Sequence, residues 1–304
     1  MTTVGELGED RLVARLCEGL PLGTDVVVGT GDDCAVVGTG EVLTLLKTDA
    51  VVEGVHFLAE EKARRVGWKA VARVLSDFAA MGGVPGELLV TLAMGPRVAL
   101  SWVEDLYRGM QDCLAKHGGA IVGGETTSLP EGASTLISVA GRGMVHREDL
   151  VTRSGGQVGD AIYVTGRLGG SLRGKHLDFT PRLAEARWLV RHHVITAMMD
   201  LSDGLAQDLP RLARMSGVGF ELDHDTIPRN EAVEVAEALG DGEDYELLFT
   251  SADEIGEGWA ARFPDLEVTR IGQLVGGSSD EIAGGWEHFR MGNRMFGPTS
   301  TSSA

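Results

Sequence analysis

The alternation of apolar and polar positions divides the chain into short strands and amphipathic helices. Apolar side chains recur at helical spacing over residues 62–80 and 101–117, and again over 205–215, where Pro210 interrupts the pattern. Short apolar runs predict strands at residues 26–28, 42–46, 88–93, 120–122, 136–145, 161–165, 197–201 and 245–250. Strands and helices that alternate in this way predict a mixed α/β fold.

Local signals predict where several of these elements begin and end. Ser101 and Glu104 have the spacing of a capping box, so a helix is expected to begin there. Asn230 is expected to cap a helix that ends at Gly240, and residues 184–192 predict another helix. The apolar residues 120–122 predict a buried strand.

The chain is long enough for two domains. A charged stretch at residues 146–149 and a loop-like stretch at 154–156 predict a boundary between them. We therefore expect an N-terminal domain over residues 1–146 and a C-terminal domain over 147–297. The Ser- and Thr-rich residues 298–304 are expected to be a disordered tail.

Charge and composition narrow the classes of function. The chain carries 27 basic and 45 acidic residues, a net charge of −18, which argues against a partner that is nucleic acid or a membrane surface. The cysteines Cys17, Cys34 and Cys113 form no CxxC pair, and no apolar run approaches the roughly 18 residues of a membrane span. The first residues do not resemble a signal peptide, so a cytoplasmic protein is expected.

Acidic residues flanked by Gly, Ser or Thr follow several predicted strands. Ligands of α/β domains bind at the carboxyl ends of strands, where such acids would repel one another without a cation between them. Oxygen ligands without His or Cys favour Mg²⁺, and neighbouring glycines allow backbone N–H groups to approach phosphate. The pattern predicts Mg²⁺-assisted phosphate chemistry at Asp32, Asp33, Asp49, Asp77, Glu125, Asp200 and Asp203.

Each of these residues also has a simpler interpretation. Asp77 could form a surface ion pair with Arg73, one helical turn before it. Ser202 or Asp203 could cap the helix that follows. His56 and Trp286 could be core residues. The prediction therefore depends on the acids occurring together.

Residues 169–175 match the glycine and lysine positions of a P-loop. The motif requires Ser or Thr next, and this chain has His176. A P-loop is therefore not expected.

Several longer motifs occur in a fixed order along the chain. They read GDDCAVV, TDAVVEGVHF, LSDFAAMGG, GGETT, LVTRSGGQVGDAIYVTG, DLSDGL and GEDYELLF. Together they resemble the thiamine-monophosphate kinase family, which is related to aminoimidazole ribonucleotide synthetase and selenophosphate synthetase. The resemblance implies an N-terminal sheet domain that pairs in a homodimer, a C-terminal α/β domain and an ATP site in the cleft between them. It also implies phosphoryl transfer from ATP to thiamine monophosphate, giving thiamine diphosphate.

The resemblance also implies roles for single residues. The ligands of several Mg²⁺ ions would be Asp33, Asp49, Asp77, Glu125, Asp200 and Asp203, with Thr48 in the same cradle. ATP would contact Gly124, Glu125, Arg153 and Ser202, with His117 at its border. Thiamine monophosphate would contact His56, Glu243 and Trp286.

The sequence departs from the family pattern in three places. Glu125 replaces an Asp, Lys47 stands where Ser or Thr is usual, and the segment from Gly166 to Arg191 is shorter than usual. Three alternatives to a kinase stay open at this point. They are a sister synthetase with another substrate, an ATP-binding homologue without activity, and a protein whose acids only occupy turns.

Overall fold

The computed structural model describes residues 2–289, and its N-terminal half is built on a six-stranded sheet with the strand order β1-β2-β3-β6-β4-β5. Only β4 and β5 pair in parallel; the other neighbours are antiparallel. The longest ladder joins β3 to β6 from Val42↔His146 to Val52↔Leu136. The strands are β1 Val26–Val28, β2 Ala35–Val37, β3 Val42–Val52, β4 Val84–Met94, β5 Ala120–Ser128 and β6 Leu136–His146.

The C-terminal half contains a second sheet of five strands, in the order β8-β10-β7-β11-β9. Every pair in it is antiparallel. The strands are β7 Ala161–Thr165, β8 Ile195–Asp200, β9 Gly219–Leu222, β10 Leu247–Ser251 and β11 Val268–Val275.

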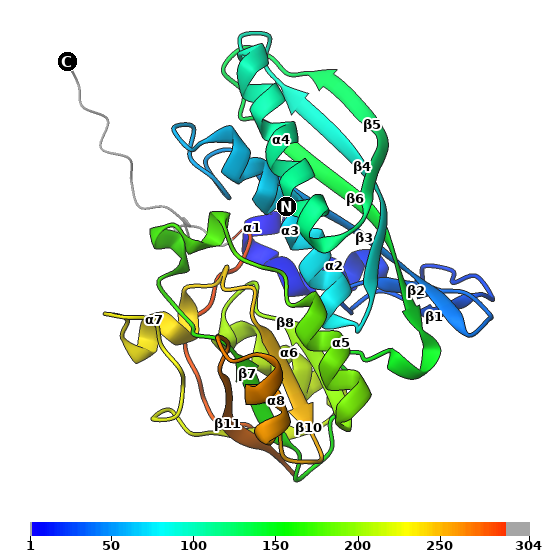
Figure 1. Ribbon diagram of the computed structural model, residues 1–304, viewed down its shortest axis with the longest axis vertical. Helices are drawn as coiled ribbons and strands as arrows, with labels where there is room; N and C mark the ends of the chain where they lie inside the picture. Colours follow the sequence, from blue (N-terminus) through cyan, green and yellow to red (C-terminus); the bar gives the residue numbers. More distant parts are fainter. Residues whose placement is uncertain (1, 290–304) are drawn as a thin grey trace.

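The helices cover one face of the first sheet and both faces of the second (Figure 1). Short 3-10 turns occupy Arg147–Asp149, Ser171–Arg173 and Lys175–Leu177. The α-helices are α1 Val4–Leu7, α2 Glu9–Cys17, α3 Ala63–Ala80, α4 Leu100–His117, α5 Leu183–His192, α6 Leu205–Ser216, α7 Val235–Gly240 and α8 Glu257–Arg262. No helix in the described part of the chain is long and apolar enough to cross a membrane.

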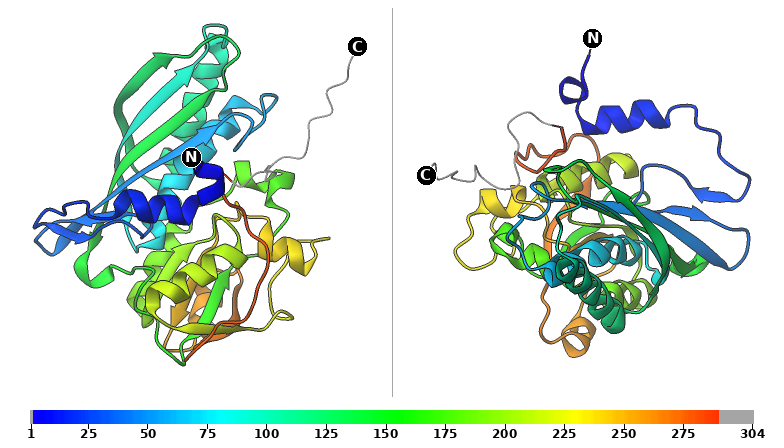
Figure 2. Two further views of the ribbon diagram at one scale, coloured as in Figure 1. Left: turned by 180° about the vertical axis from the view of Figure 1, so that it is seen from behind. Right: turned by 90° about the horizontal axis from the view of Figure 1, so that it is seen from above.

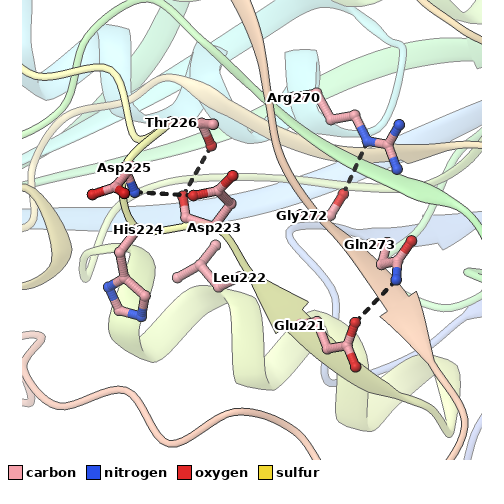
Figure 3. A pocket seen from close by; sticks show the side chains of 9 residues that line it. All are labelled: Glu221, Leu222, Asp223, His224, Asp225, Thr226, Arg270, Gly272 and Gln273. Carbon is pink, nitrogen blue, oxygen red and sulfur yellow. Dashed lines mark hydrogen bonds between the residues drawn. The ribbon is translucent and has the colours of Figure 1, made fainter.

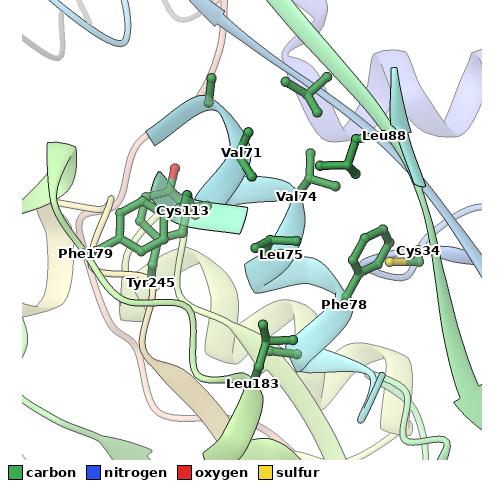
Figure 4. Packing of buried hydrophobic residues seen from close by; sticks show 14 of the residues in the cluster. Cys34, Val71, Val74, Leu75, Phe78, Leu88, Cys113, Phe179, Leu183 and Tyr245 are labelled. Carbon is green, nitrogen blue, oxygen red and sulfur yellow. The ribbon is translucent and has the colours of Figure 1, made fainter. Parts of the chain in front are cut away.

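Helix α3 is the central element of the molecule. It packs against β3 and β6 of the first sheet, against α4, and against α5 and β8 of the second half. Fourteen of its residues are buried. Figure 4 shows Val71, Val74 and Phe78 on α3 surrounded by side chains from both halves, including Leu183 and Tyr245. The two sheets therefore share one hydrophobic core across α3, and a second cluster lies between the C-terminal sheet and α6.

Two glycines allow α3 and α4 to approach closely. A Cβ atom at Gly67 would lie 1.9 Å from the carbonyl oxygen of Leu106, and one at Gly109 would lie 1.8 Å from that of Arg64. Real side chains do not tolerate such distances, so only glycine fits at these crossings. This contact fixes the position of α3, which carries Asp77.

The N-terminal helix α2 lies across the boundary between the two halves, as the dark blue helix in Figure 2 shows. Asp10 on α2 pairs with Arg211 and Arg214 of α6, and Glu9 accepts a hydrogen bond from the backbone of His288. None of the residues of α2 is buried.

The hydrophobic pattern correctly predicted the existence of most elements, and strand 161–165 to the residue. The capping box at Ser101 was wrong, because Ala99 is the N-cap of α4 and makes no side-chain bond. Asn230 is not a cap either, because α7 begins at Val235 with Glu234 before it. Pro210 lies inside an unbroken α6.

The strand predicted at 120–122 exists, but the prediction that it is buried was wrong. It is the start of β5, an edge strand that is almost entirely exposed. The domain boundary near residue 146 stays a prediction, and residues 298–304 lie outside the described part of the chain.

Candidate active site

A cavity of about 610 Å³ lies between the two halves, and we call it the central cavity. Residues from both sheets, from α2, from α3 and from α6 line it. Most of the polar lining is charged, and the apolar lining comes chiefly from α2. The predicted residues in this lining are Asp32, Asp49, Asp77, Arg153, Asp200, Ser202 and Asp203, and Lys47 is also present.

Three buried carboxylates meet beside this cavity, and two of them, Asp77 and Asp200, line it. One oxygen each of Asp33, Asp77 and Asp200 lies within 4.8 Å of the others. Asp33 comes from the loop between β1 and β2, Asp77 from α3 and Asp200 from the end of β8. We call these three residues the carboxylate cluster. The sequence predicted all three as members of one site.

The position of acids at strand ends explains this convergence only in part. Asp200 does end a strand, but Asp49 lies inside β3 and Asp77 lies in a helix. The sheets are mainly antiparallel, so the strand-end rule for parallel sheets does not bring these acids together. The contact of α3 with both sheets brings them together instead.

Burial and mutual repulsion oppose ionisation in this part of the cavity. Burial, followed by the charge of Asp33, raises the pKa of Asp200 to about 6 and that of Asp32 to about 6. Burial also raises the pKa of Asp77 above its ordinary value. Asp33 Oδ2 is buried and has no hydrogen-bond partner among the described residues. An all-oxygen set with such an unpartnered atom fits a hard divalent cation.

Basic side chains pair with the acids of the cavity. Lys47 Nζ lies 2.7 Å from Asp77 Oδ1, and Arg73 Nε lies 2.8 Å from Asp49 Oδ2. The surface pair of Arg73 with Asp77 was therefore wrong: Asp77 is buried, and Lys47 is its partner. Arg153 Nη2 lies 2.5 Å from Asp33 Oδ1, and Arg153 Nε is buried without a hydrogen-bond partner in the described residues.

Sequence reasoning missed several residues that position the acids. Ser76 Oγ donates to Asp200 Oδ2 at 2.6 Å. The fully buried Asp208 accepts from the backbone N–H of Asp203 at 3.0 Å and from Arg211, which also pairs with the carboxylate of Asp203. Ser76 adjoins Asp77, and Asp208 lies one turn before Arg211, but nothing in the sequence pattern distinguishes them from ordinary helix residues.

Ser202 and Asp203 do not cap α6. Gly204 is its N-cap, without a side-chain bond, so both side chains remain at the central cavity.

Several predicted residues do not line the central cavity, and four of these lie on the first sheet or at the end of α4. Thr48 is exposed on β3, next to Asp49 but on the opposite face, because side chains alternate along a strand. Gly124 and Glu125 lie on the exposed edge strand β5. His117 ends α4 and contacts the edge of the Trp68 ring at 5.7 Å. Its Nε2 is buried without a partner in the described residues, and burial, with Lys116, lowers its pKa to about 4.

His56 and Trp286 lie together in an aromatic cluster with His288. The ring centroids of Trp286 and His288 are 4.0 Å apart, and those of His56 and Trp286 are 6.2 Å apart. His56 Nδ1 accepts from the backbone of Val52 at 3.0 Å, and burial, with Arg73, lowers its pKa to about 2, so the ring is neutral. Trp286 Nε1 is buried without a partner in the described residues. His288, which lines the central cavity, was not predicted.

Glu243 belongs to a buried network that reaches this aromatic cluster through Lys69, whose Nζ donates to the backbone oxygen of His56 at 2.7 Å. Its carboxylate pairs with Lys69 and lies 3.5 Å from His176 Nδ1, and it accepts from Tyr245 Oη at 3.2 Å. Burial opposes the charge of Glu243, but Lys69 and His176 hold the pKa of this carboxyl below its ordinary value. Burial also lowers the pKa of Lys69 to about 8. The sequence did not indicate this network, because lysine usually lies at the surface of a protein, whereas Lys69 is buried.

The residues of the rejected P-loop motif are structural. Gly169 and Gly170 N–H groups donate to Asp244 and Asp241, and Lys175 bonds Glu246 at 3.2 Å. Only short 3-10 turns follow, so no helix N-terminus faces a phosphate here.

A second cavity of about 600 Å³ lies at the edge strand β9, its neighbour β11 and the loop that follows β9 (Figure 3). Two of its acids have local partners: the Asp223 carboxylate accepts from the backbone N–H of Asp225, and Glu221 accepts from Gln273. None of the residues predicted from the sequence lines it.

Two family models match this chain, one in each half. Residues 31–145 match the family "AIR synthase related protein, N-terminal domain", and residues 170–283 match the corresponding C-terminal domain. The chain is 37% identical over 270 residues to thiamine-monophosphate kinase of Rhodopirellula baltica, covering 83% of this chain and 84% of that protein. It is 34% identical to thiamine-monophosphate kinase of Salmonella typhimurium, covering 91% and 92%.

The fold agrees with these matches. The solved structure of AaThiL complexed with AMPPCP and TMP superposes with a TM-score of 0.82 at 30% identity, covering 95% of this chain and 99% of that one. With its two-part fold, its central cavity and these relatives, the chain belongs to the thiamine-monophosphate kinase family.

Proposed function

We propose that this protein transfers the γ-phosphoryl group of ATP directly to the phosphate of thiamine monophosphate, giving thiamine diphosphate and ADP. The observation that carries the proposal is the carboxylate cluster in the central cavity of a chain from this family. The related AaThiL structure holds AMPPCP and TMP, which supports the same pair of substrates here.

The proposal includes Mg²⁺ at the carboxylate cluster. Asp33, Asp77 and Asp200 would hold it, and Asp49 and Asp203 would supply further oxygens once the nucleotide draws Arg73 and Arg211 away from them. When bound, Mg²⁺ neutralises the phosphates of donor and acceptor and aligns them for in-line transfer.

Arg153 is the side chain best placed to contact the nucleotide phosphates. It lines the cavity, already pairs with Asp33, and retains an unpartnered Nε. Ser202 offers a hydroxyl at the same wall. Gly124, Glu125 and His117 are proposed as contacts of the rest of ATP. They lie on β5 and at the end of α4, so they require the nucleotide to extend beyond the central cavity.

The acceptor would lie against the aromatic cluster. Trp286 and His56 would contact the rings of thiamine monophosphate, and the anionic Glu243 would face its cationic ring from beneath. We assign no general base. The second pKa of a phosphate monoester lies near 6 by analogy with phosphoserine, so the acceptor is already a nucleophile at neutral pH.

We further propose that the protein is a homodimer in which the open face of the first sheet meets a second copy. Leu46, Leu89 and Val122 are 43%, 50% and 60% exposed, and they line a largely apolar hollow of about 500 Å³ on the face opposite α3. A single chain would leave this apolar surface in water. Cytoplasmic localisation is part of the proposal, and the free cysteines Cys17, Cys34 and Cys113 support it.

The direct test of the function is a product assay. The protein is incubated with ATP, thiamine monophosphate and Mg²⁺, and the products are separated by chromatography, with a parallel reaction that omits Mg²⁺. We expect thiamine diphosphate and ADP in equal amounts, and neither without Mg²⁺. ADP without thiamine diphosphate would point to a sister substrate, and nucleotide binding without any product would indicate an inactive homologue.

A further inference from the structure

Lys47 is the one departure from the family pattern that reaches the carboxylate cluster. It lies in the middle of β3, and its neighbour Thr48 faces the opposite side of the sheet. The Lys47 side chain is 24% exposed, and Nζ lies 2.7 Å from Asp77 Oδ1. Its place in the cavity is therefore fixed by an ion pair with a member of the cluster.

Carboxylates surround this ammonium group, as they would surround a bound metal ion. A lysine ammonium is charged at neutral pH. Here Nζ pairs with Asp77 of α3, Asp49 follows two residues later on the same face of β3, and one oxygen of Asp33 lies within 4.8 Å of one of Asp77. A lysine ammonium is a compact point charge, closer to a metal ion in shape than a guanidinium is.

The ammonium and a divalent ion compete for the same oxygen. Asp77 is 8% exposed, so a further cation on Oδ1 would lie a few ångströms from Nζ with little water between them. Two cations at such a separation repel one another strongly in the low dielectric of a protein interior. Lys47 and a further divalent ion therefore do not share Oδ1, whereas the other carboxylate oxygen of Asp77 is left for the Mg²⁺ proposed at the carboxylate cluster.

We propose that Lys47 acts as a tethered cation that replaces one divalent ion of the active site, so that this enzyme binds ATP with one Mg²⁺ fewer than a chain with Ser at this position. The inference rests on the proposed nucleotide and Mg²⁺ site. It predicts that Lys47→Ser opens a further metal position on Asp77 and supplies a hydroxyl oxygen beside it. Lys47 would be a positioning residue for the phosphates, through Asp77.

The test counts bound ions and does not require turnover. Mn²⁺, which replaces Mg²⁺ and is visible by electron paramagnetic resonance, is titrated into the protein in the presence of saturating AMPPCP. Wild type, Lys47→Ser and the control Lys62→Ser are compared; Lys62 is an exposed residue at the start of α3. We expect Lys47→Ser to bind about one more Mn²⁺ per chain than the other two. Equal numbers in all three folded proteins would overturn the inference.

A measurement on the wild-type protein keeps the inference testable if Lys47→Ser does not fold. In a ¹⁵N spectrum of the lysine ammonium groups, an ion-paired Lys47 gives a slowly exchanging signal, since Asp77 shields it from water. We expect this signal to persist when Mg²⁺ and AMPPCP are added, and its loss on their addition would overturn the inference. Wild-type protein that binds no Mn²⁺ with AMPPCP would instead overturn the proposed function as well.

Discussion

At the residue scale, the acids of the site were predictable and their partners were not. Acids in motifs with Gly, Ser or Thr identified Asp33, Asp77 and Asp200, because acids gathered at one site repel one another unless a cation joins them. Arg153 was found only through the family resemblance. Lys47, Arg73 and Arg211 pair with acids from other elements, and no local spacing reveals such contacts.

Asp200→Asn tests the carboxylate cluster. The amide keeps the shape of the side chain but removes a negative charge that would hold Mg²⁺, so we expect turnover to fall by about 100-fold. The metal-free variant should be at least as stable as wild type, because burial disfavours the charge of Asp200. Steady-state kinetics and thermal unfolding measure the two effects. Asp265→Asn, at an exposed site, is the control, and turnover within a few-fold of wild type in Asp200→Asn would refute the assignment.

Trp286→Phe tests the acceptor site. The smaller ring offers less surface beside His56 and His288, so the KM for thiamine monophosphate should rise several-fold while the KM for ATP stays unchanged. Both constants are measured by varying one substrate at a time. An unchanged KM for thiamine monophosphate would remove Trp286 from the site.

At the element scale, polar site residues disrupted the pattern on which strand prediction depends. The apolar run at 42–46 stops at Lys47, yet β3 continues to Val52, because Lys47 and Asp49 face the cavity and need no hydrophobic surroundings. The apolar residues of β5 suggested burial, although β5 is an exposed edge. In both strands, the surroundings of each face differ from those that the hydrophobic pattern predicts.

Gly109→Ala tests the close contact between α3 and α4. A Cβ atom there would lie 1.8 Å from the backbone oxygen of Arg64, so the helices must separate, and we expect the free energy of unfolding to fall by about 1–3 kcal/mol. Chemical denaturation measures the change. Gly40→Ala, which has no atom within 4 Å of the added Cβ, is the control. Equal stability of the two variants would show that the contact is not tight.

Asp244, which holds the segment after β7, makes the stability of the folded protein depend on pH. It is buried and accepts from Gly169 N–H at 2.9 Å, and burial raises its pKa to about 7. Between about pH 4 and 7 the native state therefore holds a proton that the unfolded state has lost, and stability falls as the pH rises through this range.

Asp244→Asn should remove this contribution. The variant should gain stability relative to wild type as the pH rises from about 4 to 7, with no further gain above that range. Thermal unfolding at a series of pH values measures the difference, with the exposed Asp225→Asn as control. A constant difference between Asp244→Asn and wild type would contradict a raised pKa.

At the scale of the whole molecule, the two sheets share α3, and the site lies where they meet. The two-part organisation was predictable from the sequence. The shared core was not, because helix periodicity shows that α3 is amphipathic but not that two sheets cover it.

Leu89→Glu tests the proposed homodimer. A charge in the middle of the open face of the first sheet should convert the dimer to monomers, which light scattering coupled to size-exclusion chromatography detects. Leu100→Glu is the control, since Leu100 is 73% exposed on α4, on the helical side. A wild-type protein that is monomeric at micromolar concentration would contradict the proposal.

The central claim is that the central cavity passes a phosphoryl group directly from ATP to the phosphate of thiamine monophosphate. The most direct measurement is a single-turnover reaction with ATP labelled in its γ-phosphate, using enzyme in excess over ATP, for wild type and Asp200→Asn side by side. We predict that the label enters the terminal phosphate of thiamine diphosphate in wild type, in step with ADP, and about 100-fold more slowly in the variant. Label that appears as free phosphate, or equal rates in the two proteins, would contradict the account.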